Sequence, residues 1–242
     1  MKTPSLFLAA VSSFALVSAR AQEKEPDIAA SFPGLKSMAV DGQGKEFALI
    51  PQKVSYDPAL AKVINKVLNP GEEGAPEVKR LISVKLDRNA EAVHFIDFDP
   101  GPSADPTFLI VDEKSGKKVG EIAADSLVVP GNGFVYAIGR SNNLHLVRQK
   151  FALRGGEFVE VKQPFSYVGL QTKANVPLTL TAEKGGGETI ANIPKDGPLE
   201  VLVSDNGYLL VKTPVGLVGW WKMKTDVMKD NAEIEGIHYA GD

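Results

Sequence analysis

The feature that most constrains this chain is a tight reversal at Asn206-Gly207, which lies between two runs of aliphatic and β-branched residues. Asn-Gly supplies the positive φ angles that a two-residue hairpin turn requires. Residues 199–203 before it and 208–213 after it are therefore predicted strands. Pro214-Val215-Gly216 marks a second turn, and residues 217–223 are predicted to form a third strand. Three short strands at this spacing predict a small barrel or meander.

A longer run across this hairpin resembles a known family. The segment Gly207-Tyr208-Leu-Leu-Val-Lys-Thr-Pro-Val-Gly216-Leu-Val-Gly219-Trp220 is similar to the second half of bacterial Src homology 3 (SH3) domains. Tyr208 stands where that family usually has Trp, and residues 177–183 replace its opening strand without the usual Arg. The resemblance implies a small SH3-like β-barrel at residues 165–224. It also implies peptide or peptidoglycan as ligand, with Tyr208, Trp220 and Trp221 as the binding residues.

The two adjacent tryptophans carry a prediction that needs no family. Neighbouring residues of a strand face opposite sides of a sheet, so Trp220 and Trp221 cannot both enter one core. Burying a Trp removes about 150–250 Å² from water, which is worth roughly 4–6 kcal/mol at about 25 cal/mol/Å². The outward ring is therefore expected to have a contact to make. Two contacts are open: packing against a neighbouring domain, or a platform for a glycan or peptide.

Residues 1–21 have the pattern of a secretory signal peptide. Lys2 gives a positive start, an apolar stretch follows, and Ala19-Arg20-Ala21 supplies a cleavage signal. The apolar stretch is too short for a membrane anchor. We therefore predict a periplasmic or secreted protein with no stable membrane insertion. The net charge of −3 offers no basic face for nucleic acid, and the absence of cysteine excludes disulfides and thiol catalysis.

Residues 57–69 carry the signals of a helix. Asp57 is a candidate N-cap, and Pro58 stands in the first turn, where its missing N–H is harmless. Apolar residues then recur at helical spacing, at Leu60, Val63, Ile64, Val67 and Leu68. Asn69-Pro70-Gly71 ends the pattern. The sequence therefore predicts one amphipathic helix docked on a sheet.

The remainder of the first two thirds reads as short strands divided by turns. Strands are predicted at residues 47–50, 78–86, 92–98, 107–111, 119–122, 134–138, 144–153 and 158–161. Short strands with short turns predict antiparallel hairpins around one sheet. The expected fold class is mainly β, with an α+β domain at residues 35–164 that holds the docked helix. A flexible leader at 22–34 precedes this domain, and a polar tail at 225–242 follows the SH3-like barrel.

The most suggestive polar cluster is Asp97-Phe-Asp99-Pro-Gly-Pro-Ser-Ala-Asp105. Carboxylates at alternate positions of a glycine-bearing loop are how many calcium sites begin. A plain turn between two strands is the alternative.

No other group of residues has catalytic or metal-binding spacing. His94, His145 and His238 are scattered. A basic edge, formed by Arg140, Arg148, Lys150 and Arg154, is most simply solvated surface. We therefore expect no enzymatic activity, no cofactor and no metal. The expected function is binding of peptide or peptidoglycan in the cell envelope. The alternative is a periplasmic inhibitor or assembly factor, whose SH3-like module is a protein–protein or interdomain contact.

Overall fold

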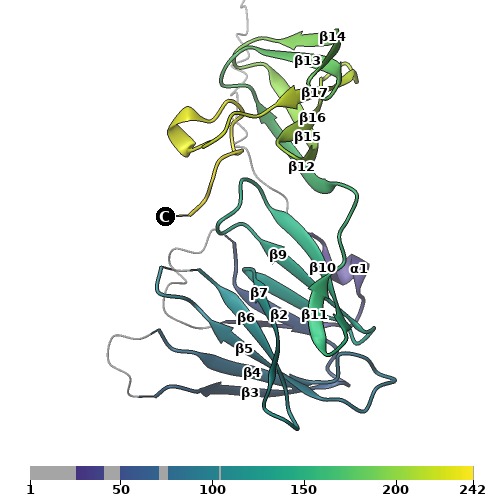
Figure 1. Cartoon of the computed structure of the whole chain (residues 1–242), viewed down its shortest axis with the longest axis vertical. Helices are drawn as coiled ribbons and strands as arrows, with labels where there is room; N and C mark the ends of the chain where they lie inside the picture. Colours follow the sequence, from purple (N-terminus) through teal and green to yellow (C-terminus); the bar gives the residue numbers. More distant parts are fainter. Residues whose placement is uncertain (1–25, 41–49, 71–75, 104, 242) are drawn as a thin grey trace, which may run out of the picture.

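The structure, a computed structural model, describes residues 26–40, 50–70, 76–103 and 105–241. The signal peptide predicted at residues 1–21 and most of the strand predicted at 47–50 lie outside these ranges. Within them the chain is mainly β, as predicted, with strands β1 to β17 in sheets of six, six and five strands (Figure 1). No described helix is both long and apolar enough to cross a membrane.

The first sheet runs in the order β1-β2-β8-β9-β10-β11. Its strands are β1 (Lys36–Ala39), β2 (Lys53–Tyr56), β8 (Ser126–Val129), β9 (Phe134–Gly139), β10 (Val147–Arg154) and β11 (Glu157–Glu160). All neighbours are antiparallel except β2 and β8, which run parallel. A parallel pair needs a long crossover connection, and here that connection contains the whole second sheet.

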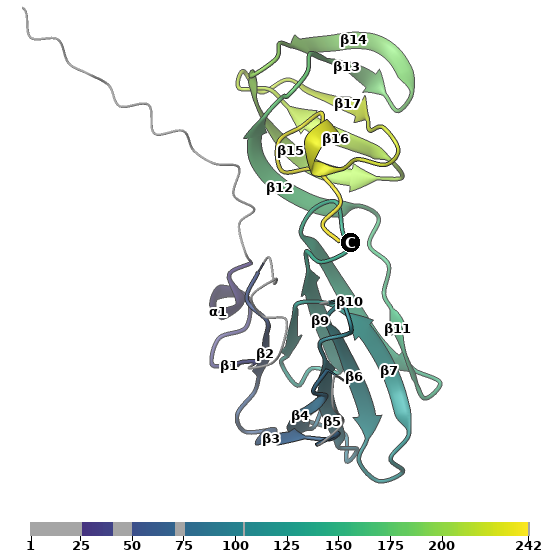
Figure 2. The same cartoon turned by 90° about the vertical axis from the view of Figure 1, so that its left-hand side faces the viewer.

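The second sheet runs in the order β3-β4-β5-β6-β7 and is antiparallel. Its strands are β3 (Ala61–Val67), β4 (Lys79–Val84), β5 (His94–Asp99), β6 (Thr107–Asp112) and β7 (Lys118–Ala123). One core cluster takes side chains from both sheets, among them Val54 and Leu127 from the first and Ile96 and Phe108 from the second. The two sheets therefore pack face to face as a sandwich (Figure 2). The prediction of an α+β domain built around one antiparallel sheet is wrong: the strands form two sheets, and one pair is parallel.

The prediction of a docked helix at residues 57–69 is wrong. Asp57 does cap a turn, because its Oδ1 accepts a hydrogen bond from the Ala59 N–H at 2.9 Å. The Leu60 N–H closes that turn on the Asp57 carbonyl at 3.0 Å. The helical signal ends there, and the chain continues as strand β3.

A β-bulge explains why β3 imitates a helix. Its better-covered residues recur at every third position, because the register with β4 shifts between Val63 and Lys66. Asn65 takes a φ of 49° within this shift, which is a left-handed conformation that Asn tolerates. An extra residue in a strand breaks strict alternation, and the resulting spacing of three is close to the 3.6 of a helix.

The segment predicted to be a flexible leader contains the α-helix α1 (Ile28–Ser31), capped by the Asp27 side chain. Ile28 and Phe32 pack against the outer face of the first sheet, in a small cluster with Ile138. The Phe32 and Tyr136 rings lie with centroids 4.9 Å apart. Residues 26–34 therefore cover part of this face.

The third sheet follows a short connection after Glu160. Its order is β12-β15-β16-β17-β13-β14. Its strands are β12 (Ser166–Lys173), β13 (Leu178–Glu183), β14 (Gly186–Ile193), β15 (Pro198–Asp205), β16 (Tyr208–Lys212) and β17 (Val218–Lys222). The sheet has its own core, which includes Leu170, Leu180, Val201 and Leu209. The closed barrel predicted at residues 165–224 is not found, because within the described residues β12 and β14 are the two open edges of this sheet.

The end of the chain is built into this core. Residues 225–242 were expected to be a polar tail, yet Ile234 and Ile237 are each only 2% exposed and belong to the core of the third sheet. We call residues 232–240 the tail segment. Beyond Ile237 it reaches the β9–β10 turn of the sandwich, where the Asn142 N–H donates to the Ala240 carbonyl at 2.7 Å. Figure 1 shows this segment in yellow, descending from the third sheet toward the sandwich.

Candidate binding face

The β16–β17 hairpin sorts the three predicted site residues onto two faces of the third sheet. Trp221 pairs with Leu209 and packs against the core. Trp220 pairs with Leu210 on the opposite face, as strand alternation predicts. Tyr208 has the same parity as Leu210, so it lies on the outer face with Trp220. The structure therefore brings Tyr208 and Trp220 together and separates Trp221 from them.

A row of large side chains crosses the outer face from one strand to the next. Tyr167 pairs with Val203, Val203 with Leu210, and Leu210 with Trp220. Tyr167 is 55% exposed, and the other three are partly exposed. We call these four residues and Tyr208 the aromatic face. Single exposed apolar residues are normal, but a continuous row across four strands is typical of an interaction site.

Lys184 covers one end of the aromatic face. From the β13–β14 turn, its ammonium lies 4.7 Å from the centroid of the Trp220 ring and 5.8 Å from that of Phe165. It also pairs with the Asp205 carboxylate. A cation over an exposed ring contributes about 0.5–1 kcal/mol. A ligand that stacks on Trp220 therefore meets aromatic rings, a cation and a carboxylate in one small area.

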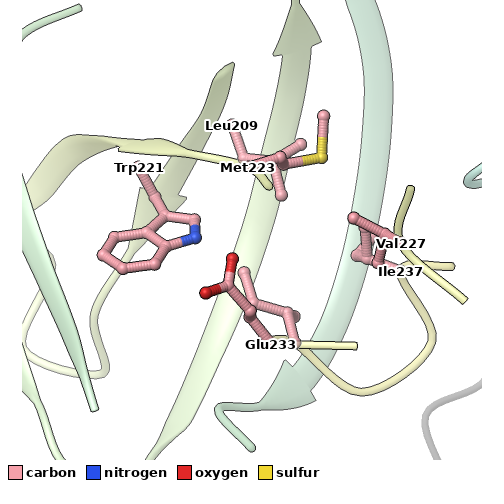
Figure 3. A pocket seen from close by; sticks show the side chains of 7 residues that line it. Leu209, Trp221, Met223, Val227, Glu233 and Ile237 are labelled. Carbon is pink, nitrogen blue, oxygen red and sulfur yellow. The ribbon is translucent and has the colours of Figure 1, made fainter. Parts of the chain in front are cut away.

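Trp221 borders a small hollow on the core side (Figure 3). The hollow is lined by Leu209, Trp221, Met223, Val227, Glu233, Ile234 and Ile237. Its volume of about 10 Å³ has room for one water molecule at most and is too small for a ligand. Figure 3 shows the Glu233 carboxylate turned toward the indole, and this carboxylate also pairs with Lys224 at 3.0 Å. Trp221 is thus placed to join the hairpin to the tail segment.

Glycine at position 219 allows this packing. An added Cβ at Gly219 would lie 2.8 Å from the Leu180 Cβ on β13, which is closer than two such atoms can approach. Glycine is therefore required before Trp220 for a local structural reason, because it lets β17 lie against β13.

The three carboxylates of the calcium hypothesis serve three separate contacts. Asp97 accepts two hydrogen bonds from the Arg80 guanidinium, at 2.8 and 2.9 Å. Asp99 caps its own turn, and Asp105 accepts from the Asn142 side chain at 2.6 Å. Across the described ranges, no group of three or more His, Cys, Asp or Glu side chains is arranged to hold a metal ion. These contacts therefore support the plain turn between two strands and not the calcium site.

The histidines occupy three different elements. His94 lies in β5, His145 lies just before β10, and His238 lies in the tail segment. Burial lowers the pKa of each. The positive charge of Arg140 lowers the pKa of His145 and His238 further. The three are therefore neutral, structural side chains at pH 7.

Sequence reasoning missed Phe165, Tyr167 and Lys184. Phe165 and Tyr167 are separated by one residue, a spacing that would place two aromatic side chains on one face of a strand. That spacing was the available signal. The sequence contains no comparable signal for Lys184, because this residue reaches Trp220 only through the folding of the β13–β14 turn.

Comparisons of this chain with protein-family models, with curated proteins and with solved structures found no match.

Proposed function

We propose that this chain is an exported, non-catalytic binding protein of the bacterial cell envelope, and that its third sheet binds a peptide or peptidoglycan. The observation that carries the proposal is the outward row Tyr167, Val203, Leu210 and Trp220. Aromatic faces stack on sugars or grip short peptides without an ionised partner. The pair of Lys184 and Asp205 adds one donor and one acceptor at the end of the row.

Two features of the sequence support the location and the ligand class. The signal-peptide pattern at residues 1–21 supports export. The resemblance of residues 207–220 to bacterial SH3 domains supports an SH3-like module at residues 165–224 with peptide or peptidoglycan as ligand.

A co-sedimentation experiment with purified cell-wall sacculi tests this function. The wild-type protein and the control variant Leu153→Ala are expected to sediment with the sacculi. Leu153 is an apolar residue of β10 that is 41% exposed and lies outside the third sheet. Trp220→Ala is expected to weaken retention about tenfold or more, because a central aromatic anchor typically contributes about 2 kcal/mol. Retention equal to wild type in a folded Trp220→Ala protein contradicts the proposal.

A second candidate is a periplasmic inhibitor or assembly factor that binds another protein through the same sheet. The observation that favours it is the apolar turn beside the aromatic face, where Val215, Leu217 and Val218 are 82%, 48% and 40% exposed. Apolar patches of this kind suit protein partners. A photo-crosslinker at position 218 in intact cells selects this candidate if it captures one envelope protein while sacculi retain nothing.

A further inference from the structure

Three side chains of the third sheet meet around one ammonium group. Lys184 stands in the β13–β14 turn, with its ammonium 4.7 Å from the centroid of the Trp220 ring and 5.8 Å from that of Phe165. The Asp205 carboxylate pairs with the same ammonium. Phe165 is 50% exposed, and Trp220 is partly exposed. Aromatic faces and a carboxylate around one cation are the composition of a site that recognises ammonium groups.

These groups come from separate elements, and they hold their places without Lys184. Phe165 immediately precedes β12, Asp205 ends β15, and Trp220 lies in β17. The Asp205 side chain is 14% exposed. Its Oδ1 also accepts a hydrogen bond from the Asn206 side-chain amide at 2.9 Å. The carboxylate is therefore positioned by the β15–β16 turn, and the ring of Trp220 by its strand.

Lys184 itself is held weakly. Its side chain is 34% exposed and extends from a turn, so it can move into water without a change in the backbone. An ion pair near the surface and a single cation–π contact each contribute little, and fixing a long stem costs conformational entropy. If Lys184 moves away, the mostly covered Asp205 carboxylate is left without its cation. Another ammonium group restores that pairing, whereas an anion does not.

We propose that the place of the Lys184 ammonium is a subsite for a lysine-type side chain of the ligand, which displaces Lys184 when it binds. The inference rests on the function proposed for the third sheet, and it narrows the ligand to a peptide with a primary ammonium on an aliphatic stem. Lys184 is then an autoinhibitory contact. The apparent affinity is reduced by the fraction of molecules in which the place is open, so removal of the Lys184 ammonium strengthens binding.

An NMR titration with Nα-acetyl-lysine amide, followed at the Trp220 indole N–H signal, tests the proposal. Lys184→Met keeps an unbranched stem and lacks the ammonium, and it is expected to bind this probe about fivefold to tenfold more tightly than wild type. Lys195→Met is the matched control, because Lys195 is an exposed lysine in another turn of the same sheet. It is expected to bind like wild type. Equal affinities of Lys184→Met and wild type would overturn the proposal.

Two further probes separate the charge from the stem. Nα-acetyl-norleucine amide keeps the stem without the ammonium, and glycinamide keeps an ammonium without the stem. Each is expected to bind Lys184→Met about tenfold more weakly than the lysine amide. Adding Asp205→Asn to Lys184→Met is expected to remove the preference for lysine over norleucine. A preference that survives this change, or equal binding of the three probes, contradicts the assigned subsite.

The sacculus experiment keeps this inference distinct from the proposed function. If sacculi retain the protein through Trp220 and the lysine amide does not bind, the ammonium subsite is wrong and the proposed function stands. If the lysine amide binds Lys184→Met as expected, and sacculi retain Trp220→Ala as well as wild type, the proposed function is wrong and the ammonium site stands.

Discussion

At the scale of single residues, burial decides how the histidines respond to pH. His145 is only 6% exposed. Burial lowers its pKa by more than the nearby Leu146 carbonyl raises it, and two arginines lower it further. The pKa of His94 is lowered by burial against a weaker opposing effect of Asp112. In the unfolded chain each of these side chains titrates near 6.5.

These lowered pKa values predict acid sensitivity. Below about pH 6.5 the unfolded chain takes up protons that the folded chain does not, so the free energy of unfolding falls as the pH drops from about 6.5 to 5. It is largest above pH 7, where the histidines are neutral in both states. Urea unfolding at pH 7.5, 6.5 and 5.5 measures the slope. His145→Gln is expected to make the slope shallower, and an identical slope in that variant contradicts this cause.

The pair of Arg80 and Asp97 predicts a large loss of stability when one partner is removed. The Asp97 side chain is 4% exposed and that of Arg80 is 24% exposed, and the Asp97 hydrogen bond is the main reason that the pKa of Arg80 is raised. Asp97→Ala leaves a half-buried guanidinium unpaired, and we expect it to lower the free energy of unfolding by about 3 kcal/mol. Asp99→Ala, which removes one turn hydrogen bond, is expected to cost about 1 kcal/mol. Denaturant titration measures both losses of stability. Equal losses would contradict the expectation that the buried, Arg80-bound carboxylate contributes more than the turn carboxylate.

The same contacts predict that calcium has no effect on stability. Because Asp97 is bound by Arg80 and Asp105 by Asn142, the carboxylates do not converge on one point. Thermal unfolding is expected at the same temperature with millimolar Ca²⁺ and with EDTA. An increase of several degrees with Ca²⁺, reversed by EDTA, would restore the calcium hypothesis.

At the scale of elements, the sequence predicted several strands closely, among them β4, β6 and β16, but missed β1, β2 and β8 and took β3 for a helix. The strand predicted at residues 208–213 is found as β16 (Tyr208–Lys212), whose burial alternates strictly. Residues 61–67 do not alternate, because the bulge at Asn65 shifts their register, and they were predicted as a helix. A bulge depends on pairing with another strand, and a single segment does not reveal it. The bulge therefore misled the prediction at β3, where the altered spacing imitates a helix, although β4 and β6 also carry register shifts and were predicted as strands.

The features of the candidate site also divide into those that the sequence predicted and those that it did not. The opposite orientation of Trp220 and Trp221 followed from strand alternation alone. The contacts of Trp220 with Lys184, and of the row with Tyr167, come from elements that are distant in the sequence. The burial of the tail segment was also missed, because Ile234 and Ile237 stand among polar residues without a strand or helix period. Their burial results from tertiary packing.

The packing of the tail segment predicts that a substitution at one of its buried positions lowers the stability of the fold. The polar composition of this region had suggested that it does not contribute to stability. Ile234 is 2% exposed and forms a β-bridge with Ala174. Ile234→Ala is expected to lower the free energy of unfolding by about 3 kcal/mol, since it leaves a cavity in the core. Met228→Ala is the control, because Met228 is 46% exposed in the same region, and it is expected to change stability by about 0.5 kcal/mol or less. Equal effects of the two variants in urea unfolding would show that the tail segment is not part of the core.

At the scale of the whole molecule, Arg140 connects the sandwich to the third sheet. Its side chain stands in the β9–β10 turn, is 5% exposed, and donates to the carbonyls of Gly236 and His238 at 3.4 and 3.1 Å. Its backbone N–H donates to the buried Asp125 carboxylate at 2.6 Å. One guanidinium therefore holds the tail segment to the turn, and the tail segment is packed into the third sheet.

This connection predicts that Arg140→Met separates the unfolding of the two parts. Both tryptophans lie in the third sheet, so tryptophan emission reports that part alone, whereas far-ultraviolet circular dichroism reports the whole chain. In the wild type the two signals are expected to change together in urea. In Arg140→Met the tryptophan transition is expected at a lower urea concentration. Arg154→Met, at an exposed position of β10, is the control, and coincident transitions in Arg140→Met contradict the coupling.

The position of Ile234 and Ile237 in a core built from β12 to β17 also fixes the order in which a nascent chain can mature. The sandwich is complete once residue 160 has left the ribosome, but the third sheet lacks part of its interior until residue 237 has been added. The part of its interior that Ile234 and Ile237 fill therefore stays uncovered until the tail segment has been synthesised. A chaperone that recognises exposed apolar strands has that interval in which to act.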